Sequence, residues 1–491
     1  MNCGVKLMDS PQIIIKQKLL STMLNKMQIK LLVFLFVFFC LLGDAFGQNK
    51  TLNIDNTLDI VRKYHPVIKQ SFLQNEMSKN ELLATKGVFD PTIQMNTEEK
   101  TYDNKFYYKF NTTELKIPLW YGIDIKAGTE NNLGDRIDPT LTKNKSAFVG
   151  VSLDPFRGIL IDKRNSIVKQ AKNFVELTKN EQLLVVNDLL LDATSAYWNW
   201  VNAYYFNDVL TRSVQNNKIR YEVIKKSFFS GDRAPIDTTE ALTQLQTFEI
   251  MQNQAAVDLQ KARLELSNYF WTDNGIPYEL QEDIVPISNF EINKINIIEL
   301  GRLEELVDKA IQEHPKIKMT DNKSAILDIE KRIKTIELFP TLKLNYNALE
   351  NTLSTISSNL NASNNAKYGV SLTMPLFQRQ ARGELAKTKN KMDDLNWNRK
   401  YITLEIENKV RGSFAEFLAL KQQIKTNEAI LNANKLLFDT ENIKFQMGES
   451  SLFLINNREL KLIETEQKHL TLKSKFYLSI YKNLWAMGSL N

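Results

Sequence analysis

Apolar residues recur at every seventh position over much of the second half of the chain. The series consists of Val410, Phe417, Ile424, Leu431, Phe438 and Phe445. A seven-residue apolar repeat is typical of a helix that packs lengthwise against its neighbours. No proline follows Pro375, so nothing after it breaks a helix in the way that proline does. The pattern predicts a long helix over 376–446, a turn over 447–453 and a return helix over 454–487.

The first half of the chain carries a similar helical pattern. Between Phe156 and Phe228 there is no proline, and Gly158 is the one glycine. The matching seven-residue series is mostly apolar and consists of Ala193, Trp200, Asn207, Val214, Tyr221 and Phe228. A helix of about seventy residues would be about 105 Å long, which is more than a globular domain needs. We predict a long helix over 156–228, a turn over 229–237 and a return helix over 238–271.

Shorter stretches alternate apolar and polar residues with a period of two, as half-buried strands do. In the second half these positions flank a Ser/Asn-rich stretch over 351–365 and are Leu342, Leu344, Tyr346, Tyr368, Val370, Leu372 and Met374. They predict a β hairpin over 340–375. The β region of the first half, 91–155, is longer and holds a further hairpin at about 106–131. We therefore expect four strands in the first half and two in the second.

The order of elements is duplicated along the chain. The sequence around His65-Pro66 recurs around His314-Pro315, and Pro91-Thr92 recurs as Pro340-Thr341 at the same offset of 249 residues. In each half a helix is expected to begin at the first of these prolines, where its missing N–H is tolerated. We divide the mature chain into two repeats, 48–297 with a linker over 272–297, and 298–491.

A signal peptide is predicted over 1–47. Lys30 precedes the uncharged run 31–42, and Ala45-Phe46-Gly47 resembles a cleavage site before Gln48. The run is too short for a typical membrane-spanning helix, and an uncleaved anchor is the alternative. The mature chain would then lack thiols, since the cysteines are Cys3 and Cys40.

The composition excludes several classes of function. A net charge of +6 over 491 residues, without a basic stripe, gives no sign of nucleic-acid binding. Three histidines and two cysteines leave few groups for transition-metal sites or Cys/His catalysis. We predict no enzyme, no cofactor and no metal site. His65 and His314 invite a metal interpretation because they are duplicated, but each precedes a proline and is expected to help start a helix.

The duplicated order of a helix, a β hairpin and a long helical hairpin, after a signal peptide, resembles the TolC-type family of outer-membrane efflux and secretion channels. The most specific likeness is Gly-Asp-Arg-Ala-Pro-Ile-Asp-Thr-Thr-Glu-Ala over 231–241, which is similar to the family's helix-tip pattern. Ala196-Tyr197-Trp198 also resembles the family's long-helix signature. The resemblance covers the whole mature chain.

The resemblance implies an α+β membrane protein with two internal repeats per protomer. Family members are homotrimers in which each protomer gives four strands to a twelve-stranded outer-membrane β-barrel, and an α-helical barrel continues it across the periplasm of a Gram-negative-type bacterium. The implied function is a passive exit duct in a tripartite efflux or type I secretion system. The implied partners are a periplasmic adaptor protein and an inner-membrane pump of the RND, ABC or MFS type. A soluble periplasmic coiled-coil adaptor or scaffold is the rival interpretation, since it has long helical hairpins but does not need alternating strands.

Two features depart from the family's pattern. The extra hairpin at about 106–131 could stand outside the membrane, line the barrel or add strands to it, and our hypothesis is that it lies outside a twelve-stranded barrel. After Gly448, Leu454 and Asn457 occupy spacings at which the family often places aspartates. Ser450 stands where an arginine often links closed tips.

The two helix turns carry the candidate site residues. Threefold symmetry would bring copies of both turns near the pore axis, where charged side chains could hold a gate closed through ion pairs. The alternative is that these groups are solvated, or that Asp232 and Asp237 cap the returning helix. The candidates are Gly231, Asp232, Arg233, Asp237, Gly448, Glu449, Leu454 and Asn457.

Aromatic residues allow two further expectations. Trp120 and Tyr121 stand at a predicted turn between strands, where they could join an interfacial aromatic girdle. The aromatic run over 197–206 is expected to pack against neighbouring helices rather than to stack on a ligand.

Overall fold

The computed structural model describes residues 50–135, 137–138, 141–287, 302–351 and 365–490. The signal peptide predicted over 1–47, the end of the predicted linker and most of the Ser/Asn-rich loop lie outside these residues. The chain divides into two compact units. In the smaller unit, strands β1 (Lys50–Leu52) and β6 (Ile284–Pro286) pair in parallel. The elements described below belong to the larger unit, which comprises Ile54–Leu280 and Phe290–Asn491.

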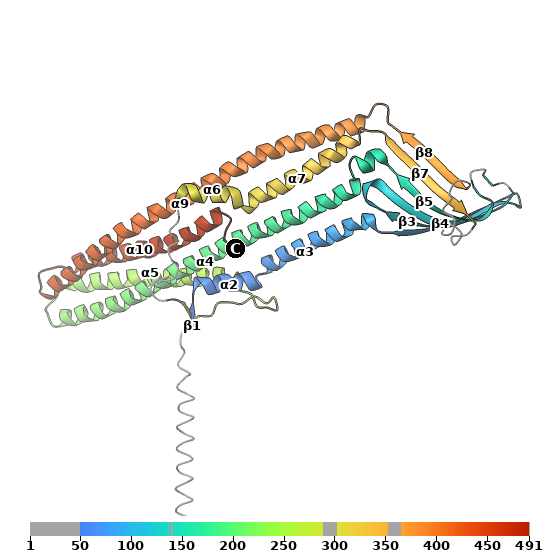
Figure 1. Ribbon diagram of the computed structural model, residues 1–491. Helices are drawn as coiled ribbons and strands as arrows, with labels where there is room; N and C mark the ends of the chain where they lie inside the picture. The colour runs from blue at the N-terminus through green and yellow to red at the C-terminus, as the bar shows by residue number, and fades with distance from the viewer. Residues whose placement is uncertain (1–49, 136, 139–140, 288–301, 352–364, 491) are drawn as a thin grey trace, which may run out of the picture. The chain divides into compact units, whose positions relative to one another are not determined.

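Two very long helices dominate the larger unit. Helix α4 (Lys163–Phe229) has 67 residues and α9 (Arg379–Gln446) has 68. Each turns back into a shorter helix, α4 into α5 (Pro235–Ser267) and α9 into α10 (Leu452–Ala486), which gives two helical hairpins (Figure 1). Further helices are α2 (Ile54–Tyr64), α3 (Pro66–Lys86), α6 (Leu303–Glu313) and α7 (Pro315–Ile336). In the described part of the chain, no helix is both long and apolar enough to cross a membrane.

The first long helix begins later than the sequence predicts. A π-helical turn, η3 (Pro155–Ile159), follows the sheet and has its own cap, because Asp154 Oδ1 accepts a hydrogen bond from Arg157 N at 3.0 Å. Helix α4 starts only at Lys163, after Asp162. The predicted start at residue 156 is therefore wrong. The return helix α5 begins at Pro235 rather than at 238, since proline suits the first turn of a helix.

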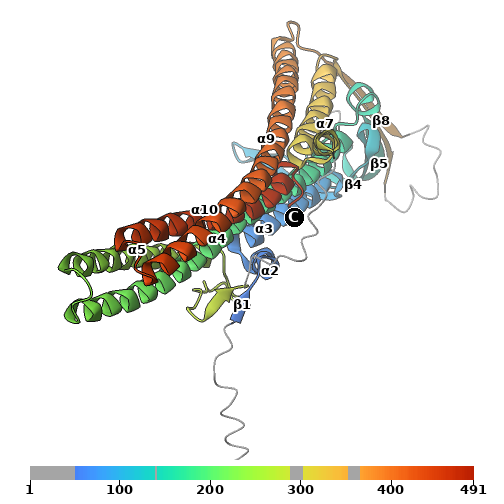
Figure 2. The same cartoon turned by 90° about the vertical axis from the view of Figure 1, so that its left-hand side faces the viewer.

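The two helical hairpins pack against each other through a buried apolar core. Leu210 of α4, Phe248 of α5 and Ile463 of α10 belong to one cluster. Figure 2 shows α4 and α5 beside α10, in agreement with the contacts of α10 with α4 and α5. A second cluster closer to the helix turns contains Ile224, Ala241 and Leu452. Full burial of such a side chain stabilises the fold by roughly 1.5–3 kcal/mol.

The duplicated histidines start the duplicated helices, as the sequence predicts. Nδ1 of His65 accepts a hydrogen bond from Val67 N (3.3 Å) at the start of α3, and Nδ1 of His314 accepts one from Lys316 N (3.1 Å) at the start of α7. Burial lowers the pKa of His65, and it lowers the pKa of His314 to about 4. Both imidazoles are thus neutral at neutral pH, which leaves a ring nitrogen free to accept.

The described strands of the larger unit form one antiparallel sheet. Its order is β2-β3-β4-β5-β7-β8. The strands keep their chain order across the sheet, and β5 of the first half pairs with β7 of the second half. The strands are β2 (Thr92–Tyr102), β3 (Lys105–Pro118), β4 (Ile123–Leu133), β5 (Asn144–Leu153), β7 (Thr341–Glu350) and β8 (Ala366–Thr373).

The extra hairpin of the first half is an internal part of this sheet. It consists of β3 and β4, joined through the short turn η2 (Trp120–Gly122). β3 pairs with β2 along its other side, and β4 pairs with β5. The pairing within one chain therefore contradicts the hypothesis that the hairpin at 106–131 stands apart from the other strands of the sheet. The physical reason is that both strands continue the alternation of their neighbours, so pairing satisfies their backbone groups without changing either face of the sheet.

Candidate functional site

One face of the sheet is apolar from edge to edge. Side chains alternate along a strand, so the pairing register fixes which residues share a face. One row of directly paired residues crosses the six described strands of this sheet and consists of Ile93, Leu115, Ala127, Val149, Ala348 and Ala366. The next row towards the helices consists of Ile117, Ile125, Val151, Tyr346 and Tyr368. These side chains are not core residues of one chain, because Ile93 is 77% and Tyr368 is 81% exposed.

The opposite face of the sheet is mainly polar. The row between the two apolar rows consists of Thr92, Lys116, Lys126, Gly150, Asn347 and Lys367. Phe148 is an exception on this face and is 3% exposed. It lies over Gly128, where an added Cβ would come within 2.7 Å of the phenyl ring, so the glycine makes room for the ring. Alternation of an apolar and a polar face is the pattern of strands between lipid and an aqueous lumen.

The sheet has two outer strands that lack a second partner strand in the described part of the chain. Every residue of β2 and of β8 is exposed, whereas β4 and β5 contain buried residues. An outer strand presents unpaired N–H and C=O groups to any further strand. Because the six strands alternate in direction, β2 and β8 are antiparallel to each other. The two edges therefore suit pairing between neighbouring copies.

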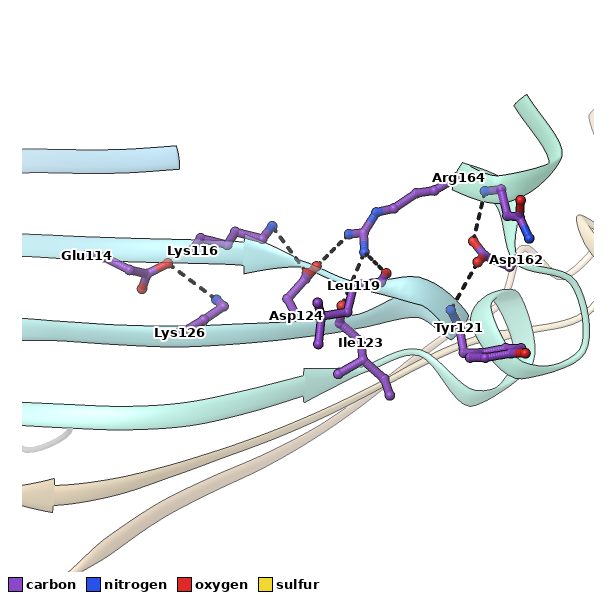
Figure 3. Close-up of polar contacts among 10 residues, drawn as sticks. Glu114, Lys116, Leu119, Tyr121, Ile123, Asp124, Lys126, Asp162 and Arg164 are labelled. Carbon is purple, nitrogen blue, oxygen red and sulfur yellow. Dashed lines mark hydrogen bonds and ion pairs between the residues drawn. The ribbon is translucent and has the colours of Figure 1, made fainter. Parts of the chain in front are cut away.

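One ion pair and two hydrogen bonds from Arg164 join the sheet and its β3–β4 turn to the start of α4 (Figure 3). Arg164 of α4 donates from Nη2 to Asp124 Oδ1 of β4 (2.6 Å) and from Nη1 to the carbonyl oxygens of Leu119 (3.0 Å) and Ile123 (3.3 Å). Lys116 of β3 lies 3.3 Å from the other oxygen of Asp124. These contacts hold the β3–β4 turn against the first turn of the long helix.

Asp162 has two roles at this junction, because it caps the start of α4 and also holds the β3–β4 turn. Asp162 Oδ1 accepts a hydrogen bond from Asn165 N (3.1 Å), while its Oδ2 accepts one from Tyr121 N (3.1 Å) (Figure 3). Tyr121 has a φ of 59°, a left-handed conformation that this turn requires. Tyr121 and Trp120 are each about three-fifths exposed, and the ring centroids of Phe89 and Trp120 are 6.4 Å apart.

The helix turns at the far end of both hairpins have the same backbone geometry. Gly231 and Gly448 each have a φ of 82°, which favours glycine. The N–H after each glycine bonds back across the helix end, from Asp232 N to Ser227 O (3.0 Å) and from Glu449 N to Lys444 O (2.8 Å). This is the Schellman arrangement. Both glycines thus end a long helix.

Arg233 connects the two turns within one chain. Its guanidinium lies over the ring of Phe445, 4.4 Å from the centroid, and its Nη1 lies 4.0 Å from Asp237 Oδ2. Such a cation–π contact is worth roughly 0.5–1 kcal/mol at an exposed site. Arg233 and Asp237 are candidates from the sequence, whereas Phe445 is not, because it is far away in the sequence and looks like one more member of the seven-residue series.

Within the described residues of one chain, the remaining candidate residues form no hydrogen bond or ion pair between the two helix turns. The N-cap residue of α5 is Ala234, and no side chain donates or accepts a capping hydrogen bond there. Neither Asp232 nor Asp237 therefore caps α5 in this structure. Asp232 and Glu449 are exposed. Asn457 donates to Phe453 O in its own helix (2.9 Å), and Leu454 is 44% exposed.

A buried ion pair between the hairpins could not be predicted from the sequence. Arg220 Nη1 of α4 lies 2.6 Å from Glu459 Oε2 of α10, and Asn217 Nδ2 donates to the other carboxylate oxygen at 3.1 Å. The side chain of Glu459 is only 6% exposed. Nothing in either local sequence marks these residues as partners, because 239 positions separate Arg220 from Glu459.

The described residues hold no group of three or more His, Cys, Asp and Glu side chains arranged to bind a metal ion. The geometry instead offers surfaces: a two-faced sheet with open edges, a charged junction and two helix turns. Together these features are extended surfaces.

Solved structures of bacterial channels are similar to this fold. The Campylobacter jejuni CmeC outer membrane channel has a TM-score of 0.63 at 14% identity, over 89% of this chain and 86% of that chain. The Neisseria gonorrhoeae MtrE outer membrane channel in its open state has a TM-score of 0.63 at 13% identity, over 90% and 95%. VceC, an outer membrane protein of Vibrio cholerae, has a TM-score of 0.62 at 12% identity, over 89% and 96%. No protein-family model and no curated protein sequence matches the chain, so the likeness is one of fold.

Proposed function

We propose that this chain, which has the fold of the TolC-type outer-membrane channels, is the outer-membrane channel of a tripartite efflux or type I secretion system. It would act as a passive exit duct rather than as an enzyme. The observation that carries the proposal is the sheet with one apolar and one polar face and two exposed edges. A soluble adaptor, the rival interpretation, would have no use for six strands with an unbroken outward apolar row.

Copies of the chain would close the sheet into a barrel. Backbone groups within lipid must all be paired, so an open sheet cannot remain in a membrane. Six strands are fewer than the roughly eight of the smallest membrane barrels, and β2 of one copy can pair with β8 of the next. The proposed homotrimer would thus contain three times the six described strands, or eighteen, rather than the twelve expected from the family resemblance.

The junction residues support a membrane boundary at the helical end of the sheet. Exposed apolar side chains gather where strands and helices meet, beside the polar contacts of Asp162 and Arg164. They include Trp120, Tyr121, Ile159, Leu160, Leu376 and Phe377. Aromatic residues are enriched at membrane interfaces, so the proposal places Trp120 and Tyr121 in a girdle there. The helices would then continue into the periplasm.

The helix turns would form the periplasmic opening, where an adaptor linked to an inner-membrane pump would dock. Large apolar side chains are exposed around both turns and include Phe229, Ile236, Met447, Phe453 and Leu454. Exposed apolar patches of this kind mark interaction sites. Arg233, between Asp237 and Phe445, would hold the two turns of one chain together and stabilise the closed opening.

Single-channel recording in planar bilayers tests the proposal. The purified protein is expected to form discrete channels, and Arg233→Ala is expected to raise the open fraction because the contacts of Arg233 with Phe445 and Asp237 are lost. Asp237→Ala should act in the same direction, but less strongly. Asp258→Ala, which removes an exposed carboxylate on α5 that accepts from Gln254, is the matched control. Wild-type protein that inserts into bilayers without conducting would contradict the function, whereas unchanged opening in Arg233→Ala would contradict only the gate.

A further inference from the structure

We propose that a basic cavity on the polar face of the sheet binds anionic groups and makes the channel anion-selective. The cavity has a volume of about 570 Å³. This inference rests on the proposed function, because it takes the polar face as the wall of the lumen. It goes further by assigning a preferred charge to what passes through that lumen.

The cavity belongs to the polar face and lies at its helical end. Residues of β3, β4, β5 and β7 line it with Lys116, Lys126, Ser152 and Lys343, all of which the register places on that face. The first turns of α4 and the preceding η3 turn complete the wall. Solutes moving between the sheet and the helices would therefore pass directly over this cavity.

Basic groups outnumber acidic groups in the cavity. Its described lining includes six basic residues, Lys116, Lys126, Arg157, Lys163, Arg164 and Lys343, and three acidic ones, Asp124, Asp154 and Asp162. Asp124 is paired with both Arg164 and Lys116. The carboxylates of Asp154 and Asp162 accept hydrogen bonds from backbone N–H groups. The acidic groups are thus already engaged in the structure of the junction.

Three of the basic side chains keep their charge available for a ligand. Within the residues that the structure describes, Arg157, Lys163 and Lys343 form no ion pair with a carboxylate. Nε of Arg157 is buried without a hydrogen-bond partner there. A buried N–H donor without an acceptor is unfavourable by about 1–3 kcal/mol, and an oxyanion in the cavity would supply the acceptor. Phosphate and carboxylate groups have the charge and acceptor geometry that guanidinium and ammonium groups recognise.

Symmetry would repeat this cavity around the lumen. In the proposed homotrimer, each of the three cavities would contribute its unpaired bases to one belt where the barrel meets the helices. A belt with an excess of one charge raises the local concentration of counter-ions and disfavours ions of its own sign. Chloride and anionic solutes would therefore be favoured over potassium at this level of the channel.

Reversal potentials across a salt gradient measure this preference. Wild-type channels are expected to pass chloride more readily than potassium. The double variant Lys163→Gln/Lys343→Gln should lower the chloride-to-potassium permeability ratio roughly threefold or more, because it removes two unit charges several ångströms from the ion path. The control Lys172→Gln/Lys179→Gln removes the same charge from exposed positions of α4 outside the cavity and should leave the ratio unchanged. An equal ratio in both double variants and the wild type would overturn the proposal.

Calorimetric titration of the detergent-purified full chain with inorganic phosphate separates this inference from the proposed function. Phosphate binding that is lost in Lys163→Gln/Lys343→Gln but kept in Lys172→Gln/Lys179→Gln is the expected result. If the wild-type protein forms no channel, the proposed function fails, and the titration alone then tests whether the cavity binds anions. Absence of phosphate binding to the wild-type protein would then overturn the cavity as an anion site.

Discussion

Val151→Arg is expected to abolish the assembly of the chain in membranes. Val151 lies on β5 in the second apolar row, paired with Ile125 and Tyr346, and is 44% exposed. Its replacement therefore removes little packing within one chain and places a charge on the surface that we assign to lipid. An arginine on the lipid face destabilises a membrane barrel by up to about 2–4 kcal/mol, with the largest cost at the bilayer midplane, and a trimer would contain three such residues. The measurement is the amount of heat-modifiable oligomer in outer-membrane fractions.

Thr112→Arg is the matched control for this variant. Thr112 lies on β3 between Asn96 and Glu130, on the polar face. The same new side chain should be tolerated there, because it would face the water-filled lumen beside a carboxylate. Normal oligomer from Val151→Arg together with loss of oligomer from Thr112→Arg would reverse the assignment of the two faces.

Glu459→Ala is expected to destabilise the helical hairpins by about 3–5 kcal/mol, since it leaves the largely buried guanidinium of Arg220 without its counter-charge. Asn217 would also lose the acceptor of its hydrogen bond. The measurement is the denaturant midpoint of the helical circular dichroism signal of the detergent-purified protein. A shift no larger than that of a surface variant would show that the pair does not tie α4 to α10.

Two further variants isolate the cause of this loss. Glu464→Ala breaks the exposed pair with Lys461 on the same helix and should change stability by no more than about 0.5 kcal/mol. Arg220→Met/Glu459→Leu replaces both charges by apolar groups and should recover much of the stability, since no unpaired charge is left buried. If the double variant recovers little stability, the packing of the two side chains contributes more to stability than their charges do.

The helices and the two faces of the sheet could be predicted because each depends on a local period. The alternation at Leu342 and Leu344 predicts that both side chains lie on the same face of the sheet. Glycine at 231 and at 448 predicts the ends of the two long helices. The seven-residue series also predicts burial near the middle of α9, where Val410 and Phe417 are 1% and 5% exposed. Farther along, Ile424 and Leu431 are only partly buried, as expected if another copy covers them.

The contacts of the candidate site could not be predicted, because they join residues that only the fold brings together. Asp124 and Arg164 are 40 positions apart, and Arg233 reaches Phe445 from the other half of the chain. The resemblance to a family with four strands per protomer led to the wrong placement of the extra hairpin. The alternation within β3 and β4 already matched that of their neighbours, and it was the better guide.

The number of strands in the assembled barrel tests the central claim most directly. A cryo-EM map of the protein purified from membranes should show three copies that share one closed barrel of eighteen strands, with β2 of each copy paired to β8 of the next. The apolar row through Val149 should face the detergent or lipid, and the row through Lys126 should face the lumen. A barrel of twelve strands with β3 and β4 folded away from it, or a sheet that stays open in a soluble particle, would contradict this account.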